Sequence, residues 1–97
     1  MKVEFSKRTG APERLVSEAE LHFDDDGPLA GLKLVGFSVW LSAEGQHYVT
    51  MPCRPFGAGA ERRYFDLLRG VDDSGASVKR LKAWILEQFE ARGPREA

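Results

Sequence analysis

Apolar and polar residues alternate with a period of two from Leu15 to Phe23, and this pattern is the strongest constraint on the fold of the chain. Apolar and small residues occupy the odd positions, and mainly acidic or polar residues occupy the even ones. Because successive side chains of a β-strand point to opposite faces, the stretch predicts a strand with one face on a core and an acidic face toward solvent. Val3 and Phe5 alternate with polar neighbours and predict a short first strand.

A more apolar stretch, residues 29–41, follows the turn-forming segment Asp24–Pro28. Its apolar phase slips by one position between Leu34 and Val35, beside Gly36, and a β-bulge is one device that produces such a slip. A strand that is apolar on both faces is either covered twice within the fold or buried by a partner chain. We expect a dimer interface here, formed by Leu32, Leu34, Val35, Phe37 and Val39.

Residues 42–45 predict a hairpin turn, and residues 46–51 predict the return strand, which Pro52 ends. The segment 54–63 is interrupted by Pro55, Gly57 and Gly59 and is interpreted as a loop. Residues 64–68 alternate again and predict one more short strand.

The last element is predicted to be a helix, because apolar residues recur every three or four positions from Val78 to Phe89. Ser77 or Ser74 is expected to cap its N-terminus, and Gly93 is expected to end it.

These elements predict an α+β fold, namely an antiparallel β meander of four or five strands with one C-terminal α-helix. The 97 residues suffice for one domain, which we place over residues 1–93, with a frayed tail over 94–97. A domain of this size buries only about 60–70% of its unfolded surface. Dimerisation is a common way to add stability, and we expect a homodimer formed through β-strands.

The charge is unevenly distributed, although the formal net charge is only −1. Residues 1–53 contain five basic and eight acidic residues, whereas residues 54–92 contain eight basic and six acidic ones. Near-neutrality excludes binding to nucleic acid through bulk charge and leaves room for a local patch. The candidate phosphate contacts are Arg54, Arg62 and Arg63 in the Gly-rich segment and Lys79, Arg80 and Lys82 at the start of the helix. The alternative is that these cations form a solvated face.

Residues suited to catalysis or metal binding are few. Cys53 and His47 could form a nucleophile–base pair, but no third orienting residue is evident. One cysteine and two scattered histidines lack zinc-ligand spacing, and Asp24–Asp26 lacks the alternating spacing of a calcium loop. We therefore expect a protein that is not an enzyme and has no catalytic residues, no metal and no cofactor.

The sequence shows no apolar run that approaches the roughly 18 residues of a membrane span, and no signal peptide is visible. The lone Cys53 cannot form an internal disulfide and fits a reducing compartment. These features predict a cytoplasmic protein without a membrane partner.

The order of motifs resembles the stage V sporulation protein G family, small bacterial proteins linked to sporulation, septation and gene regulation. The resemblance covers roughly residues 15–91. It rests on "LHFDDD", a hydrophobic strand, a hairpin, "YVTMPCR", a Gly-containing loop with "ERRYFD", and a helix ending in "ILEQFE". Its most specific piece is Met51-Pro52-Cys53-Arg54, in which Cys53 replaces the usual serine and a proline follows where lysine is common.

The resemblance implies a dimer assembled through β-strands that binds DNA, or in some members RNA. Arg54 and one of Arg62 or Arg63 match the basic loop of the family, and the helix cations match its general basic character. We therefore expect a cytoplasmic, dimeric regulator that binds nucleic acid. The alternative is a protein-interaction module whose interface is the apolar strand, with no binding of nucleic acid.

Overall fold

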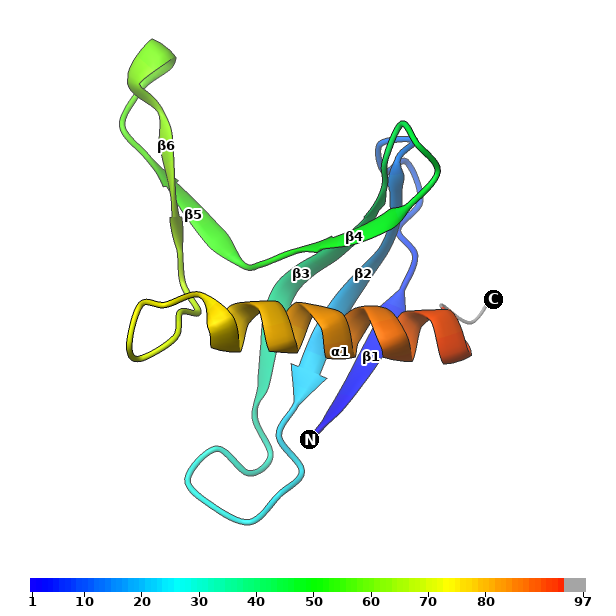
Figure 1. Ribbon diagram of the computed structural model, residues 1–97, viewed down its shortest axis with the longest axis vertical. Helices are drawn as coiled ribbons and strands as arrows, with labels where there is room; N and C mark the ends of the chain where they lie inside the picture. The colour runs from blue at the N-terminus through cyan, green and yellow to red at the C-terminus, as the bar shows by residue number, and fades with distance from the viewer. Residues whose placement is uncertain (94–97) are drawn as a thin grey trace.

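The computed structural model describes residues 1–93 and has two sheets and one long helix. The main sheet is an antiparallel meander in the order β1-β2-β3-β4, and β5 and β6 form a second, two-stranded sheet (Figure 1). The elements are β1 (Lys2–Ser6), β2 (Leu15–His22), β3 (Lys33–Leu41), β4 (His47–Thr50), β5 (Cys53–Phe56), a 3-10 turn (Gly59–Glu61), β6 (Arg63–Asp66) and α1 (Ala76–Arg92). The α+β meander with one C-terminal helix is confirmed, and the predicted tail over 94–97 lies outside the described residues.

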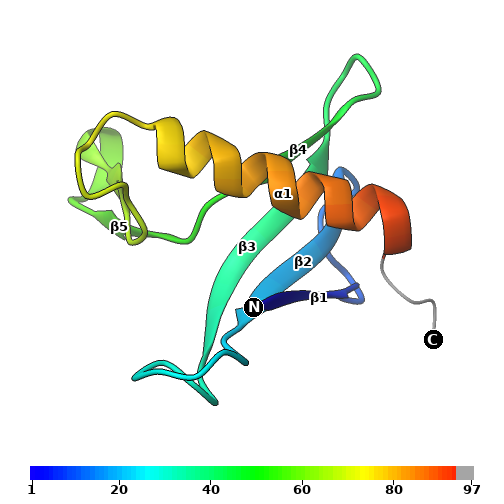
Figure 2. The same ribbon diagram turned by 60° about the horizontal axis from the view of Figure 1, so that its bottom comes forward.

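Helix α1 lies across one face of the main sheet and forms the core with it (Figure 2). The odd residues of β2 are all buried, as their alternation predicts. Of these, Ala19 and Leu21 belong to the same core cluster as Ile85 and Phe89, which are buried members of the stripe on α1. Burying a side chain of this size stabilises the fold by roughly 1.5–3 kcal/mol.

The predicted irregularity in β3 is a β-bulge. Ala19 pairs with Phe37 and Leu21 pairs with Leu34, so that two residues of β3 lie opposite one residue of β2. One of the two is Gly36, whose φ of +109° favours glycine. The bulge explains how Leu34 and Phe37 both point toward the core although they are three positions apart.

Two details of the elements go beyond the sequence pattern. β3 begins at Lys33, inside the apolar stretch that starts at Leu29, because residues 27–32 form turns in which the Leu32 N–H donates to the carbonyl of Leu29 at 3.0 Å. The N-cap of α1 is Gly75 and not a serine, with φ of 80° and no side-chain cap. Ser74 nevertheless contributes, because its hydroxyl accepts the N–H of Ala76 at 3.3 Å.

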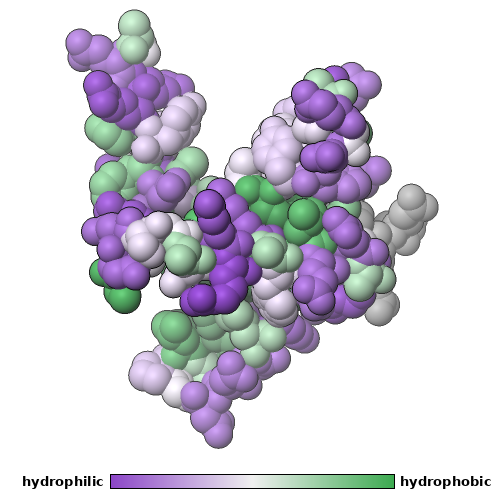
Figure 3. All heavy atoms as spheres, in the orientation of Figure 1, coloured by the Kyte–Doolittle hydropathy of each residue, from purple (hydrophilic) through white to green (hydrophobic). Residues whose placement is uncertain are grey.

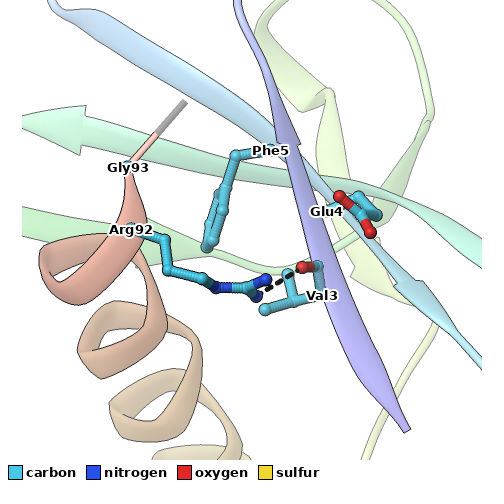
Figure 4. A pocket seen from close by; sticks show the side chains of 5 residues that line it. All are labelled: Val3, Glu4, Phe5, Arg92 and Gly93. Atoms are coloured by element: carbon cyan, nitrogen blue, oxygen red, sulfur yellow. Dashed lines mark hydrogen bonds between the residues drawn. The ribbon is translucent and has the colours of Figure 1, made fainter. Parts of the chain in front are cut away.

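The C-terminal end of α1 is attached to the edge strand β1 (Figure 4). The Gly93 N–H donates to the carbonyl of Phe89, as expected for a terminating glycine. Arg92 then donates from Nη2 to the carbonyl of Val3 at 2.8 Å. This bond ties together two segments that are far apart in the sequence and occupies a backbone acceptor of an edge strand.

The prediction of a loop over 54–63 is wrong, because this segment forms most of a β-ribbon. We call residues 53–66, comprising β5, the 3-10 turn and β6, the ribbon. It projects from the main sheet as a separate arm (Figure 1), and its base is closed where the Leu67 N–H donates to the carbonyl of Pro52 at 3.0 Å. Every residue of β5 and β6 is exposed. Within residues 1–93, no helix is both long and apolar enough to cross a bilayer.

Candidate nucleic-acid interface

The register of the ribbon places arginine and phenylalanine side chains on one face. Arg54 pairs with Phe65, and Phe56 pairs with Arg63. Cross-strand partners share a face, and residues two apart on one strand share it too, so these four side chains form one surface. We call Arg54, Phe56, Arg63 and Phe65 the ribbon face.

The other side of the ribbon differs in chemistry. By the same alternation it carries Cys53, Pro55, Tyr64 and Asp66. It therefore has one aromatic ring, one acidic side chain and no arginine, and it provides an internal comparison for the ribbon face.

The two phenylalanine rings of the ribbon face contact each other and remain open to solvent. The ring centroids of Phe56 and Phe65 are 6.5 Å apart in an edge-to-face arrangement. Phe56 is 45% exposed and Phe65 is 44% exposed. The guanidinium carbon of Arg69 lies 4.2 Å from the centroid of Phe65, which is a cation–π contact. Aromatic side chains are thus held in place without being buried.

A shallow pocket of about 430 Å³ opens on this surface. Arg54, Phe56, Phe65 and Leu67 line it. Its volume lies in the range of about 300–1,000 Å³ that is typical of small-molecule sites. The lining combines flat apolar rings with one cation.

The ribbon and the residues that follow it form the basic part of the chain. Residues 53–69 contain four arginines and two acidic residues, Glu61 and Asp66, a formal net charge of +2. Among residues 1–93, the salt bridges join the N-terminus, Lys2, Arg8, His22 and Lys33 to acidic side chains, and none involves an arginine of the ribbon. Figure 3 shows hydrophilic and more apolar residues interleaved along this arm, which a notch separates from the β3–β4 end.

The predicted cations of the helix occupy its first turns. Lys79 and Arg80 are exposed, and Lys82 is half-buried. Arg80 donates from Nη2 to the hydroxyl of Ser77 at 3.4 Å. Both ribbon views place this end of α1 near the base of the ribbon (Figures 1 and 2), whereas the 3-10 turn that precedes Arg62 and Arg63 lies at the far tip of the ribbon.

The predicted interface residues, which lie in β3 or directly before it, divide between the core and the surface. Phe37 and Val39 are buried within the single chain, at 1% and 0% exposure, and Leu34 is half-buried against the same core. Leu32 and Val35 are both 55% exposed. The apolar character of β3 on one face therefore reflects coverage by α1, and Phe37 and Val39 offer no side-chain surface to a partner.

The outward face of the main sheet carries a mixed polar and aromatic surface. The Trp40 indole donates to the hydroxyl of Thr50 at 3.0 Å, and its register partner Tyr48 is 47% exposed. Farther along this face, Glu20 is within 2.8 Å of His22 Nε2. That hydrogen bond, with a smaller contribution from a neighbouring lysine, lowers the pKa of Glu20 below its ordinary value of 4.5.

The structure separates the residues considered for catalysis. Cys53 is exposed at the base of the ribbon. The His47 ring packs against Phe89 of α1 with centroids 5.2 Å apart, whereas His22 lies on the outward face of the sheet. No three His, Cys, Asp or Glu residues within residues 1–93 gather in a way that could hold a metal ion.

Phe56, Phe65 and Arg69 are candidates that the sequence pattern does not indicate, because Pro55, Gly57 and Gly59 favour an irregular loop over much of this segment. The signal was present as two short alternations, Arg54-Pro55-Phe56 and Arg63-Tyr64-Phe65, each with an arginine and a phenylalanine two positions apart. Only the pairing of β5 with β6 shows that the two alternations share one face.

The fold and this surface define a small α+β domain that presents a basic, aromatic β-ribbon. No protein-family model, no curated protein and no solved structure matches the chain at a significant level.

Proposed function

We propose that this protein is a cytoplasmic, dimeric regulator that binds DNA or RNA, of the kind represented by the stage V sporulation protein G family. The observation that carries the proposal is the ribbon, which projects from the domain and presents arginines that form no salt bridge within residues 1–93. Arg54, Arg62 and Arg63 contact phosphate groups in this proposal. The role is binding, without catalysis.

The physical basis is local charge. Guanidinium groups donate two hydrogen bonds to a phosphate, and their planar geometry suits this contact better than a point charge does. A two-stranded ribbon is also narrow enough to enter the major groove of a duplex. Lys79, Arg80 and Lys82 supply a second patch near the base of the ribbon. A protein with a formal net charge of −1 then binds through the ribbon and this patch alone.

The dimer is part of the proposal, because two ribbons would double a footprint that is small in one chain. The exposed apolar residues Leu32 and Val35 support an interface at this end of β3. Sedimentation equilibrium at micromolar concentration tests this part separately. A dimer mass that becomes monomeric in Leu32→Asp/Val35→Asp supports it, and a monomer mass of the unchanged protein contradicts it.

The binding site is tested by the salt dependence of affinity for mixed DNA and RNA oligonucleotides, measured by fluorescence anisotropy. We expect the triple variant Arg54→Ala/Arg62→Ala/Arg63→Ala to bind more weakly than the unchanged protein. The slope of log affinity against log salt should fall by about 2–3, because each lost phosphate contact removes about 0.7–0.9 from it. Unchanged affinity and slope in this variant would contradict the assigned site.

A matched control removes the same formal charge elsewhere. Lys7→Ala/Arg8→Ala/Arg14→Ala takes three cations from the loop between β1 and β2, and should leave the slope unaltered. If both triple variants weaken binding equally, net charge and not the ribbon determines affinity. If micromolar protein binds no nucleic acid at low salt, the alternative of a protein-interaction module is favoured.

A further inference from the structure

The ribbon face carries two exposed aromatic rings that the proposed phosphate contacts do not use. Phe56 and Phe65 are nearly half exposed and belong to a two-stranded sheet, outside the core formed by α1 and the main sheet. An isolated two-stranded ribbon is marginally stable in water. The contact between the two rings helps to hold the strands of the ribbon together, but nearly half of each residue stays open to solvent and is available to a ligand.

We infer that the ribbon face binds unpaired nucleobases by stacking them on Phe56 and Phe65, so that the protein prefers single-stranded nucleic acid to duplex. This inference rests on the proposed function and names the class of nucleic acid that the site takes. Arg54 and Arg63, which alternate with the two rings on the same face, meet the phosphates on either side of the stacked bases.

The charge of the ribbon face favours single-stranded nucleic acid over an apolar partner. A purely apolar partner would leave the arginines of the ribbon face desolvated without a counter-charge, which is costly. A single strand offers what this surface needs, because it has a flat apolar base and an anionic phosphate in each nucleotide. Proteins that bind single strands combine the same two elements, a basic track and aromatic stacking platforms.

The rings also favour a single strand over a duplex. Bases inside a duplex are stacked on each other and present only their edges in the grooves. An aromatic platform needs the face of a base, which is accessible when the base is unstacked. The pocket of about 430 Å³ beside the rings is bordered by Arg54 and Leu67 and is open to solvent, so a base can enter without displacing the core.

Arg69 has a positioning role in this site. Its guanidinium carbon lies 4.2 Å from the centroid of Phe65, and Phe56 contacts the same ring edge-to-face. These two neighbours restrict how Phe65 can turn. A base that stacks on the site then meets a ring that is already oriented, which reduces the ordering cost of binding.

The experiment compares ring variants with a control on the opposite side of the same ribbon. Anisotropy titrations would use a labelled oligothymidine and a duplex of equal length, at one fixed salt concentration. We expect the unchanged protein to bind the single strand more tightly, and Phe56→Ala or Phe65→Ala to weaken that binding by about tenfold, since one base–aromatic stack is worth that order of affinity. Tyr64→Ala removes a ring from the other face that is even more exposed, at 66%, and should have little effect.

A second pair of substitutions separates stacking from folding of the ribbon. Phe65→Tyr keeps a flat ring and should retain affinity, whereas Phe65→Leu keeps apolar volume without a ring and should lose it. The salt slope should stay unaltered in the phenylalanine variants and fall by about 0.7 in Arg54→Ala, because only the latter removes a phosphate contact.

The outcomes distinguish the inference from the proposed function. Equal binding of single strand and duplex, with unaffected affinity in the phenylalanine variants and reduced affinity in the arginine variants, overturns stacking and leaves the proposed function standing. Absence of any binding by the unchanged protein overturns both. A change of sedimentation mass in Phe56→Ala/Phe65→Ala, without a change in nucleic-acid affinity, assigns the rings to a contact between copies of the chain and overturns the inference.

Discussion

Gly36→Ala is expected to destabilise the protein where the main sheet meets the base of the ribbon. Gly36 has φ of +109°, and an added Cβ would lie 2.9 Å from the Cβ of Pro52. Pro52 is buried, and its carbonyl accepts the N–H of Leu67 that closes the ribbon. Backbone strain of this kind costs about 1–3 kcal/mol, and overpacking adds a similar amount, so we expect the free energy of unfolding to fall by about 2–6 kcal/mol.

Gly45→Ala is the matched control, because Gly45 lies in the β3–β4 hairpin with φ of +83° and has no atom within 4 Å of an added Cβ. This substitution should lower the free energy of unfolding only through backbone strain at positive φ, by about 1–2 kcal/mol. Urea unfolding followed by the fluorescence of Trp40 and Trp84 would measure both variants. If Gly36→Ala loses no more stability than Gly45→Ala, the contact with Pro52 does not restrain the bulge, and the reasoning is refuted.

Three further predictions concern the core, the edge strand and the acidic face. Phe89→Ala should lower the free energy of unfolding by about 3–5 kcal/mol in urea titrations, because it removes a buried ring that packs against rings of β1 and β4. A loss of less than about 1 kcal/mol would contradict tight packing of α1 on the sheet. Arg92→Ala should speed amide hydrogen exchange in β1, since the bond to the carbonyl of Val3 is lost, and unaltered exchange there would show that this bond is unimportant. Glu20 has a pKa lowered below 4.5 in the folded protein, chiefly by its hydrogen bond to His22. Its contribution to stability is therefore present above about pH 4.5 and is lost as pH falls through the lower folded pKa, and Glu20→Gln should make unfolding less pH-dependent in this acidic window.

The sequence predicted those parts of the fold that depend on local periodicity. The alternation over 15–23 matches β2, the three- and four-residue spacing matches α1, and the phase slip beside Gly36 matches the bulge. Each of these signals is contained within a few neighbouring residues. Local patterns of this kind reflect which face of one element is buried, and so they survive in the folded protein.

The errors arose where long-range packing decides the outcome. The apolar pattern on both sides of β3 predicts that Phe37 and Val39 lie in a dimer interface, yet α1, which begins far along the chain, buries them. The ribbon was missed because Pro55 and Gly57 are unfavourable in strands, whereas pairing between β5 and β6 overrides that preference. The arginines of the site were predicted from composition, but their neighbours Phe56 and Phe65 became visible only through that register.

The arrangement separates stability from function. The core lies between α1 and the main sheet, whereas the candidate site lies on a ribbon whose strand residues are all exposed. Substitutions on the ribbon face should therefore alter binding with little effect on global unfolding. This separation is what makes the binding experiments interpretable.

Amide chemical-shift mapping during titration with a short oligothymidine tests the central claim most directly. We expect shift changes concentrated in residues 53–69, with smaller changes at the start of α1, and none on the outward face of the main sheet. Changes confined to β1 and β2, or no changes at saturating oligonucleotide and low salt, would contradict it.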